Sequence, residues 1–263
     1  MEEEFGGYDI VIQAGQSNAE GVGVGKIEDA YAPNDKVYYL TSKKKVEHTP
    51  ERVVIEFYDE PFCLELAKER KSGDLIVSDF SLYFSRKYIE SGFLKEGRKL
   101  LIVRAGIGGT GFKKGNWGVN SMLHNKMLEM TDYALSLHKG NKVVAFLWHQ
   151  GEHDAFERNE PNTFERKLSE MVFGVRERYG NIPFIAGDFV REWKQKNIEL
   201  CTPIVEKIRR VTETVKNAGF VETEDLLSNN EKIGNGDDIH FCRESLVFLG
   251  ERYCKLYCNL IEK

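Results

Sequence analysis

The stretch "VIQAGQSNAEG", residues 11–21, passes from a continuous apolar segment into a turn of small and amide residues. A short apolar run that stops at turn residues is typical of a strand covered on both faces. Gly15 begins the turn, and Ser17 follows within two residues. The stretch therefore predicts a core strand that presents a serine, which either reacts or merely caps the next helix.

Apolar runs like the first one, residues 8–14, recur along the chain and predict further strands. They are residues 99–105, 142–148, 182–189 and, with a weaker pattern, 219–226. Amphipathic stretches of helical length lie between or after them, at residues 78–91, 121–138, 162–179, 198–218 and 243–260. Strands that alternate with helices predict a parallel sheet with helices on both faces, which is a three-layer α/β/α sandwich.

Two segments stand apart from this alternation. Residues 36–62 contain two β-rich runs around a polar turn with a proline, so we expect an antiparallel ribbon laid over the sheet edge near the first loop. Pro203 falls inside the stretch 198–218, where it predicts the start of a helix or a kink in it.

Composition sets the class of protein. The 263 residues suffice for one large α/β domain, residues 1–263, and 41% hydrophobic with 30% charged residues is ordinary for a soluble globular chain. The net charge of −5 argues against a nucleic-acid partner. The sequence shows no secretory signal or apolar run of membrane-spanning length, and its five cysteines lack a disulfide spacing. We therefore expect a cytoplasmic protein with reduced thiols and no membrane partner.

Polar and glycine residues follow the predicted strands. Residues 15–18 come after the first strand, 106–111 after the second and 149–154 after the third, while 236–240 precede the last helix. Ligands of such sheets bind beyond the carboxyl ends of the strands. The four segments are therefore expected to meet at one site.

A serine hydroxyl becomes a nucleophile when a base takes its proton. His240 is the candidate base for Ser17, and Asp237, three residues earlier, can accept the other ring N–H and fix the tautomer. Asp238 is the alternative carboxylate, although a residue two positions away usually points elsewhere. Acyl transfer also needs donors for an oxyanion, which the backbone N–H groups of Gly108, Gly109 and Ser17 could supply.

The motifs "GQSNAEG", "GIGGTGF", "WHQGEHDA" and "GDDIHF" stand in the order found in SGNH hydrolases. From about residue 9 to 253 the chain resembles the branch of sialate O-acetylesterase-like and acetylxylan esterase-like carbohydrate esterases. The resemblance implies a flavodoxin-like sheet of five parallel strands in the order 2-1-3-4-5. It also implies a serine esterase that acts on a small acetylated carbohydrate, of sialic acid or xylo-oligosaccharide type, without a cofactor.

The same resemblance implies roles for individual residues. Ser17 would be the nucleophile, with Asp237 and His240 as its catalytic pair. Gly109 or Gly108 would supply the oxyanion N–H together with Gln150, which stands where the wider superfamily has an asparagine. Gln16, Asn18, Glu152 and Trp117 are expected to contact the substrate or to support the site, as is Asp154. For Trp117 and Phe112, core packing and lining of the sugar pocket both remain open.

Two other functions compete with the esterase. The segment "HQGEH", 149–153, matches the His-x-x-Glu-His pattern of some zinc peptidases, with His149, Glu152 and His153 as the metal site. That pattern needs a helix, whereas a strand-like run precedes it and Gly151 interrupts it. A non-catalytic carbohydrate-binding domain would apply if Ser17, His240 and Asp237 did not meet.

Overall fold

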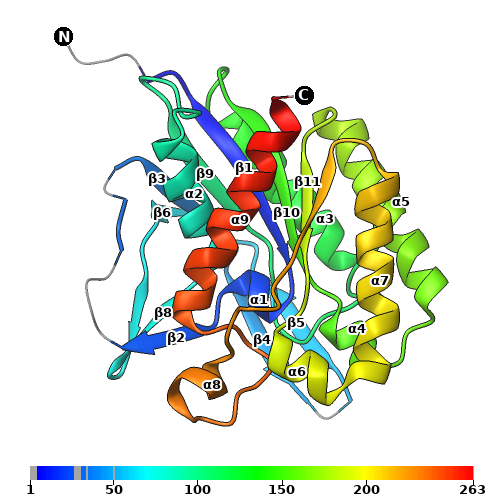
Figure 1. Cartoon of the computed structure of the whole chain (residues 1–263). Coiled ribbons are helices and arrows are strands. Elements are labelled where there is room, and N and C mark those ends of the chain that lie inside the picture. The colour runs from blue at the N-terminus through cyan, green and yellow to red at the C-terminus, as the bar shows by residue number, and fades with distance from the viewer. Residues whose placement is uncertain (1–4, 27–30, 34, 50, 263) are drawn as a thin grey trace.

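A computed structural model of the chain describes residues 5–26, 31–33, 35–49 and 51–262. A seven-stranded sheet runs through its centre (Figure 1). In spatial order the strands are β12 (Ala218–Val221), β11 (Phe184–Gly187), β10 (Lys142–His149), β1 (Tyr8–Gly15), β9 (Lys99–Arg104), β3 (Val37–Thr41) and β6 (Cys63–Leu66). All neighbours pair in parallel except β6, which is antiparallel to β3.

The predicted α/β class and strand order are confirmed. The five expected strands stand in the order β9-β1-β10-β11-β12, which is 2-1-3-4-5. The sheet is wider than expected, because β3 and β6 extend it beyond β9. β3 comes from the segment 36–62, which was predicted to form a ribbon outside the sheet, and β6 follows directly after that segment.

Helices cover both faces of the sheet. One face carries α2 (Phe80–Glu90) and α9 (Arg243–Ile261), and the other carries α3 (Met122–Ser136), α5 (Pro161–Tyr179) and α7 (Ile198–Thr214). Shorter helices lie in the connections; they are α1 (Ser17–Glu20), α4 (Glu152–Phe156), α6 (Arg191–Lys196) and α8 (Asn229–Ile233). Pro203 lies within α7, which starts five residues earlier, so the interpretation of Pro203 as a helix start is wrong.

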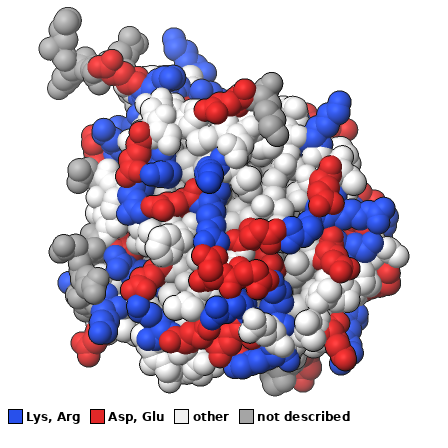
Figure 2. Space-filling view, viewed as in Figure 1, with Lys and Arg blue, Asp and Glu red and all other residues white. Residues whose placement is uncertain are grey.

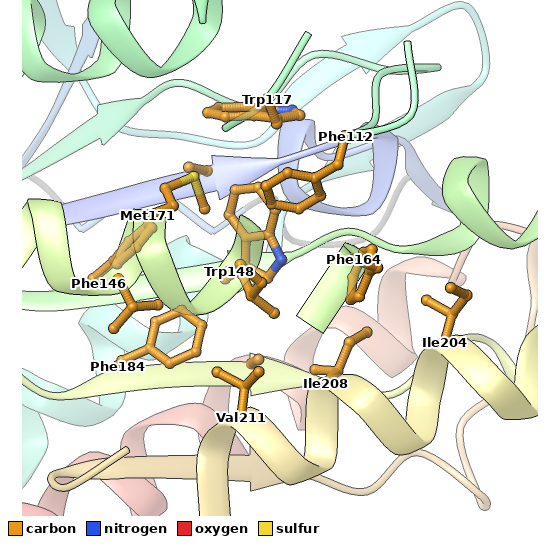
Figure 3. Packing of buried hydrophobic residues seen from close by; sticks show 14 of the residues in the cluster. Phe112, Trp117, Phe146, Trp148, Phe164, Met171, Phe184, Ile204, Ile208 and Val211 are labelled. Carbon is orange, nitrogen blue, oxygen red and sulfur yellow. The ribbon is translucent and has the colours of Figure 1, made fainter. Parts of the chain in front are cut away.

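The alternation of side chains along β10 builds the two halves of the core. Phe146 and Trp148 point into the cluster under α3, α5 and α7 (Figure 3). Ala145 and Leu147 belong to the cluster on the other face, with residues of α2 and α9. Burial of a large apolar side chain contributes about 1.5–3 kcal/mol. Such alternation therefore fixes which face of the strand meets which helices.

Trp117 belongs to this core rather than to a substrate pocket. Its ring centroid lies 5.0 Å from that of Trp148, and that of Phe112 lies 5.7 Å from Trp148. Both side chains are buried (Figure 3). Of the two alternatives left open for these rings, the structure therefore favours core packing, and the Phe112 ring also lies 5.3 Å from that of Phe164 on α5.

A smaller ribbon does form from part of the segment 36–62. β4 (Lys44–His48) pairs in antiparallel fashion with β5 (Val53–Phe57). Residues of β3 joined the main sheet instead, because Val37, Tyr39 and Leu40 are buried there. A third sheet consists of β2 (Gly23–Lys26), β8 (Leu75–Ser78) and β7 (Arg70–Ser72).

The surface seen in Figure 2 mixes charges of both signs. Lys and Arg side chains are interspersed with Asp and Glu over this face. Within the described part of the chain, no helix combines the length and apolar character needed to cross a membrane.

Candidate active site

The turn after β1 requires a glycine. Gly15 has φ of +134°, and a Cβ there would lie 2.1 Å from the carbonyl oxygen of His149 on β10. This close approach lets the Gln16 N–H donate to the same carbonyl at 3.0 Å. The chain then turns into α1 at once, which places Ser17 at the carboxyl end of the central strand.

Ser17, His240 and Asp237 form a hydrogen-bonded chain. The Ser17 Oγ lies 2.8 Å from His240 Nε2, and His240 Nδ1 lies 2.8 Å from Asp237 Oδ1. Asn229 Nδ2 also donates to Asp237, at 2.8 Å. Burial raises the pKa of Asp237, but the hydrogen bonds from His240 and Asn229 outweigh this and lower the pKa overall. The structure thus brings together the three residues that the sequence singled out.

The neighbouring Asp238 faces away from the His240 ring. Its Oδ2 lies 2.9 Å from Lys196 Nζ, in an ion pair at the surface. Of the two adjacent carboxylates, Asp237 is therefore the one that can orient the imidazole.

Asn18 joins the loops of the site. Its Nδ2 donates to Glu152 Oε1 at 2.8 Å and to the Ile239 carbonyl at 3.1 Å, and its Oδ1 accepts from the Phe241 N–H at 3.2 Å. One amide side chain therefore holds the His240 loop against the turn that carries the serine. Asn18 and Glu152 were expected to contact the substrate or to support the site, and they lie within hydrogen-bonding distance of each other here.

The glycines after β9 differ in what their N–H groups do. The Gly108 N–H donates to Glu20 Oε2 at 2.9 Å. Gly109 has φ of +70° and lines the same pocket, and its N–H makes no hydrogen bond to any residue that the structure describes. Of the two glycines, Gly109 is therefore the one with a free donor.

Gln150 does not reach the pocket. Its side chain is fully buried, and its Nε2 donates to Asp154 Oδ2 at 2.6 Å and to the Thr110 carbonyl at 3.3 Å. Both amide hydrogens are thus engaged within the protein. The expectation that Gln150 donates to an oxyanion is wrong for this arrangement, because the nearby Asp154 carboxylate holds its amide group.

Asp154 and Trp117 hold the glycine loop from behind. Asp154 accepts from the backbone N–H groups of Phe112 and Lys113 at 2.9 and 2.8 Å. Trp117 Nε1 donates to Thr110 Oγ1 at 3.0 Å. Trp117 therefore supports the loop through the core and has no place on the substrate side.

The residues of the zinc alternative do not converge. His149 ends β10 and is fully buried, and burial lowers its pKa to about 3. Its Nε2 lies 3.8 Å from Glu152 Oε1, and His153 belongs to the next helix, α4. No group of three or more His, Cys, Asp or Glu residues that could hold a metal ion occurs in the described ranges.

A pocket of about 520 Å³ opens over Ser17 and His240. Gln16, Gly108, Gly109 and Glu152 line it, as the sequence predicted, and so do residues that the sequence reasoning missed: Glu20, Val22, His48, His153, Phe156, Trp193, Asp238 and Ile239. Glu20 could have been found, since it lies three residues after Ser17 in the same short helix. His48 comes from the ribbon, whose position depends on tertiary contacts that no sequence motif indicates.

A model of one protein family matches residues 7–259, and its description is carbohydrate esterase, sialic acid-specific acetylesterase. The solved structure of NanS is 18% identical and aligns with a TM-score of 0.74 over 98% of this chain and 99% of that one. A protein of Arabidopsis thaliana is 19% identical, with a TM-score of 0.66 over 96% and 98% of the two chains.

A structure described as a carbohydrate acetylesterase from Xanthomonas citri is 15% identical, with a TM-score of 0.64. The alignment covers 96% of this chain and 56% of that one. No curated protein matches the sequence. At these identities the solved structures show a shared fold.

Proposed function

Since the chain belongs to the family of carbohydrate esterases described as sialic acid-specific acetylesterases, and is thus a carbohydrate acetylesterase, we propose that it works through an acetyl-enzyme on Ser17. One observation carries the proposal: two hydrogen bonds of 2.8 Å connect Ser17 to His240 and His240 to Asp237. This is the geometry that an activated serine needs.

The reaction has two halves. The Ser17 Oγ attacks the acetyl carbonyl while His240 Nε2 accepts its proton, and Asp237 stabilises the imidazolium that results. His240 then gives the proton to the departing sugar oxygen, which breaks the ester bond and leaves the acetyl group on Ser17. A water molecule, deprotonated by His240, attacks this acetyl group, and Ser17 leaves with the proton as acetate forms.

Each half forms an oxyanion that needs donors. We assign the Gly109 N–H to this role together with the Ser17 N–H. Gln16 is a further candidate in place of Gln150, because it lines the pocket and its Oε1 accepts from the His153 N–H at 3.0 Å. Its Nε2 makes no hydrogen bond within the described residues, so it is available to a substrate.

The substrate we propose is a small acetylated sugar, of sialic acid or xylo-oligosaccharide type. The mechanism uses no cofactor and no metal ion, and we place it in a single domain, residues 1–263. The five cysteines are all free in the structure, which fits a protein that works in the reducing cytoplasm.

The test uses an aryl acetate and an active-site label. The wild-type protein should release the aryl alcohol, and a serine-directed organophosphate should modify Ser17, as located by mass spectrometry of peptides. Ser17→Ala should lose the activity, with Ser136→Ala, at an exposed serine on α3, as the matched control. The serine mechanism would be wrong if Ser17→Ala kept its activity and the organophosphate left Ser17 of the wild-type protein unmodified.

A further inference from the structure

Asn229 is the first residue of α8, and its side chain is buried beside the loop that carries Asp237 and His240. Its Nδ2 donates to Asp237 Oδ2 at 2.8 Å. Both oxygens of that carboxylate lie near His240 Nδ1, at 2.8 and 3.0 Å. The Asp237 carboxylate thus contacts the imidazole and the Asn229 amide at the same time.

The backbone around the start of β2 fixes which way the Asn229 amide points. The Val24 N–H donates to Asn229 Oδ1 at 3.0 Å, and Asn229 Nδ2 donates to the Val22 carbonyl at 3.3 Å. A flipped amide would turn its NH₂ group toward the Val24 N–H and its oxygen toward the Asp237 carboxylate, so it would lose these bonds. Asn229 is therefore held as a donor to Asp237.

The main chain of α8 anchors the same loop independently of the Asn229 side chain. The Asn229 N–H donates to the His240 carbonyl at 2.8 Å, and the Asn230 N–H donates to the Asp237 carbonyl at 2.8 Å. Replacement of the Asn229 side chain leaves both of these donors in place. The amide contact to Asp237 can therefore be removed while the loop keeps its backbone anchors.

The amide contact matters most when the imidazole becomes charged. In the proposed reaction His240 turns into an imidazolium, which an ionised Asp237 stabilises. Burial raises the pKa of Asp237, but the hydrogen bonds from His240 and Asn229 lower it overall. The Asn229 donor also restricts rotation of the partly exposed carboxylate, so that its oxygens stay near His240 Nδ1.

We propose that Asn229 is a positioning residue of the esterase, which holds the charged Asp237 carboxylate toward His240. The inference rests on the proposed function of Ser17 and deepens it, because it adds a fourth side chain to the hydrogen-bonded chain. Asn229 is not among the described residues that line the pocket, so it acts through Asp237. Since hydrogen bonds to charged groups are stronger than neutral ones, loss of this bond should lower kcat by about tenfold.

The experiment is a double-mutant cycle between Asn229→Ala and Asp237→Ala, with an aryl acetate as substrate. In the wild-type background Asn229→Ala should lower kcat by about tenfold and leave KM nearly unchanged. In the Asp237→Ala background it should lower kcat by less than about threefold, because no carboxylate remains to be held. Asn230→Ala is the matched control. Its side chain bonds to Glu192 and to the Gly236 N–H, so any loss should be equal in both backgrounds.

The cycle distinguishes positioning of the carboxylate from support of the fold. Equal losses of kcat in both backgrounds, or no loss in the wild-type background, would overturn the inference. If melting curves show that Asn229→Ala does not fold, Asn229→Asp replaces it and the same comparison decides. Its carboxylate keeps an acceptor for the Val24 N–H but offers Asp237 no amide donor. Full activity of Ser17→Ala on the same ester would overturn the proposed function itself, whatever the Asn229 variants do.

Discussion

His240 and His149 each stand three residues from a carboxylate. His240 and Asp237 are 24% and 28% exposed in their side chains, and their closest atoms lie 2.8 Å apart. His149 and Glu152 are both fully buried, and the shortest distance between them is 3.8 Å. The same spacing in sequence thus produces one hydrogen-bonded pair at a pocket and one pair without a hydrogen bond in the core.

The difference lies in what each ring can do with a proton. Tyr253 donates its hydroxyl to the Trp148 carbonyl at 2.8 Å, so His149 Nδ1, at 3.1 Å from that hydroxyl oxygen, carries the hydrogen. Burial holds the pKa of His149 at about 3, and burial also raises the pKa of Glu152. His149 therefore stays neutral, whereas the carboxylate beside His240 can stabilise a ring that becomes positive in the mechanism that we propose.

The largest effect should follow from His240→Gln. Removal of the base leaves the Ser17 proton without an acceptor, so we expect kcat to fall by about 10⁴-fold or more. The thermal midpoint should change little, because the ring is partly exposed. Initial rates on an aryl acetate, with a melting curve for each sample, measure both. A variant that retains most of its activity would show that another group acts as the base.

Replacement of the orienting carboxylate should have the next largest effect. Asp237→Asn should lower kcat/KM by about 10²-fold or more, because the imidazolium loses its partner. Asp238→Asn is the matched control and should lose little, since that side chain bonds to Lys196. Kinetics of both variants on one ester decide between them. A larger loss of kcat/KM in Asp238→Asn than in Asp237→Asn would make Asp238 the carboxylate that orients His240. The serine–histidine mechanism would remain.

His149→Asn should act on stability instead of on chemistry. The change disrupts a buried hydrogen bond to Tyr253 and removes ring volume, and such losses cost about 1–3 kcal/mol of unfolding free energy. We expect kcat to change by less than about tenfold. Denaturant titration and steady-state kinetics measure the two quantities. A collapse of kcat at unchanged stability would mean that the buried pair takes part in the reaction.

Glu152→Gln should change how stability depends on pH. Because burial raises the pKa of Glu152 in the folded state, the folded protein holds this proton more tightly than the unfolded chain does. The stability that this proton contributes is present below the unfolded pKa and is lost as pH rises through the folded pKa. The variant should lack this loss, which melting curves from acidic to neutral pH would show. Parallel curves for the two proteins would indicate that folding does not shift the pKa of Glu152.

The smallest effect concerns metal ions. Dialysis against a strong chelator should leave esterase activity unchanged, because His149, Glu152 and His153 do not form a ligand cluster. The measurement compares esterase activity before dialysis, after dialysis and after addition of zinc. Activity that vanished and returned with zinc would make the 149–153 segment the centre of the reaction.

The sequence predicted the parts of the molecule that follow local rules. Apolar runs and amphipathic stretches located five strands and five long helices, since burial on both faces of a sheet leaves a continuous apolar pattern. Ser17, Asp237 and His240 were found because their motifs lie at strand ends or a turn, where this fold collects ligands.

The parts that depend on tertiary contacts were not predicted. The sequence of residues 37–41 resembles half of a hairpin. In the structure these residues pair in parallel with β9 and so extend the main sheet. Gln150 carries an amide in the right loop, yet Asp154 four residues later holds it. Trp117 is close in sequence to the glycine loop, but its ring packs in the core. Burial of a large aromatic ring is strongly favourable, and nearness in sequence to a site does not place a side chain in it.

The bonds from Asn18 to the Ile239 carbonyl and the Phe241 N–H span 221 and 223 residues. A ribosome that adds 5–20 residues per second makes Phe241 roughly 10–45 s after Asn18. During that time β1 can emerge, but Ser17 lacks both His240, its proposed base, and the loop that Asn18 holds. In the mechanism that we propose, ester cleavage therefore begins only when these two distant segments meet.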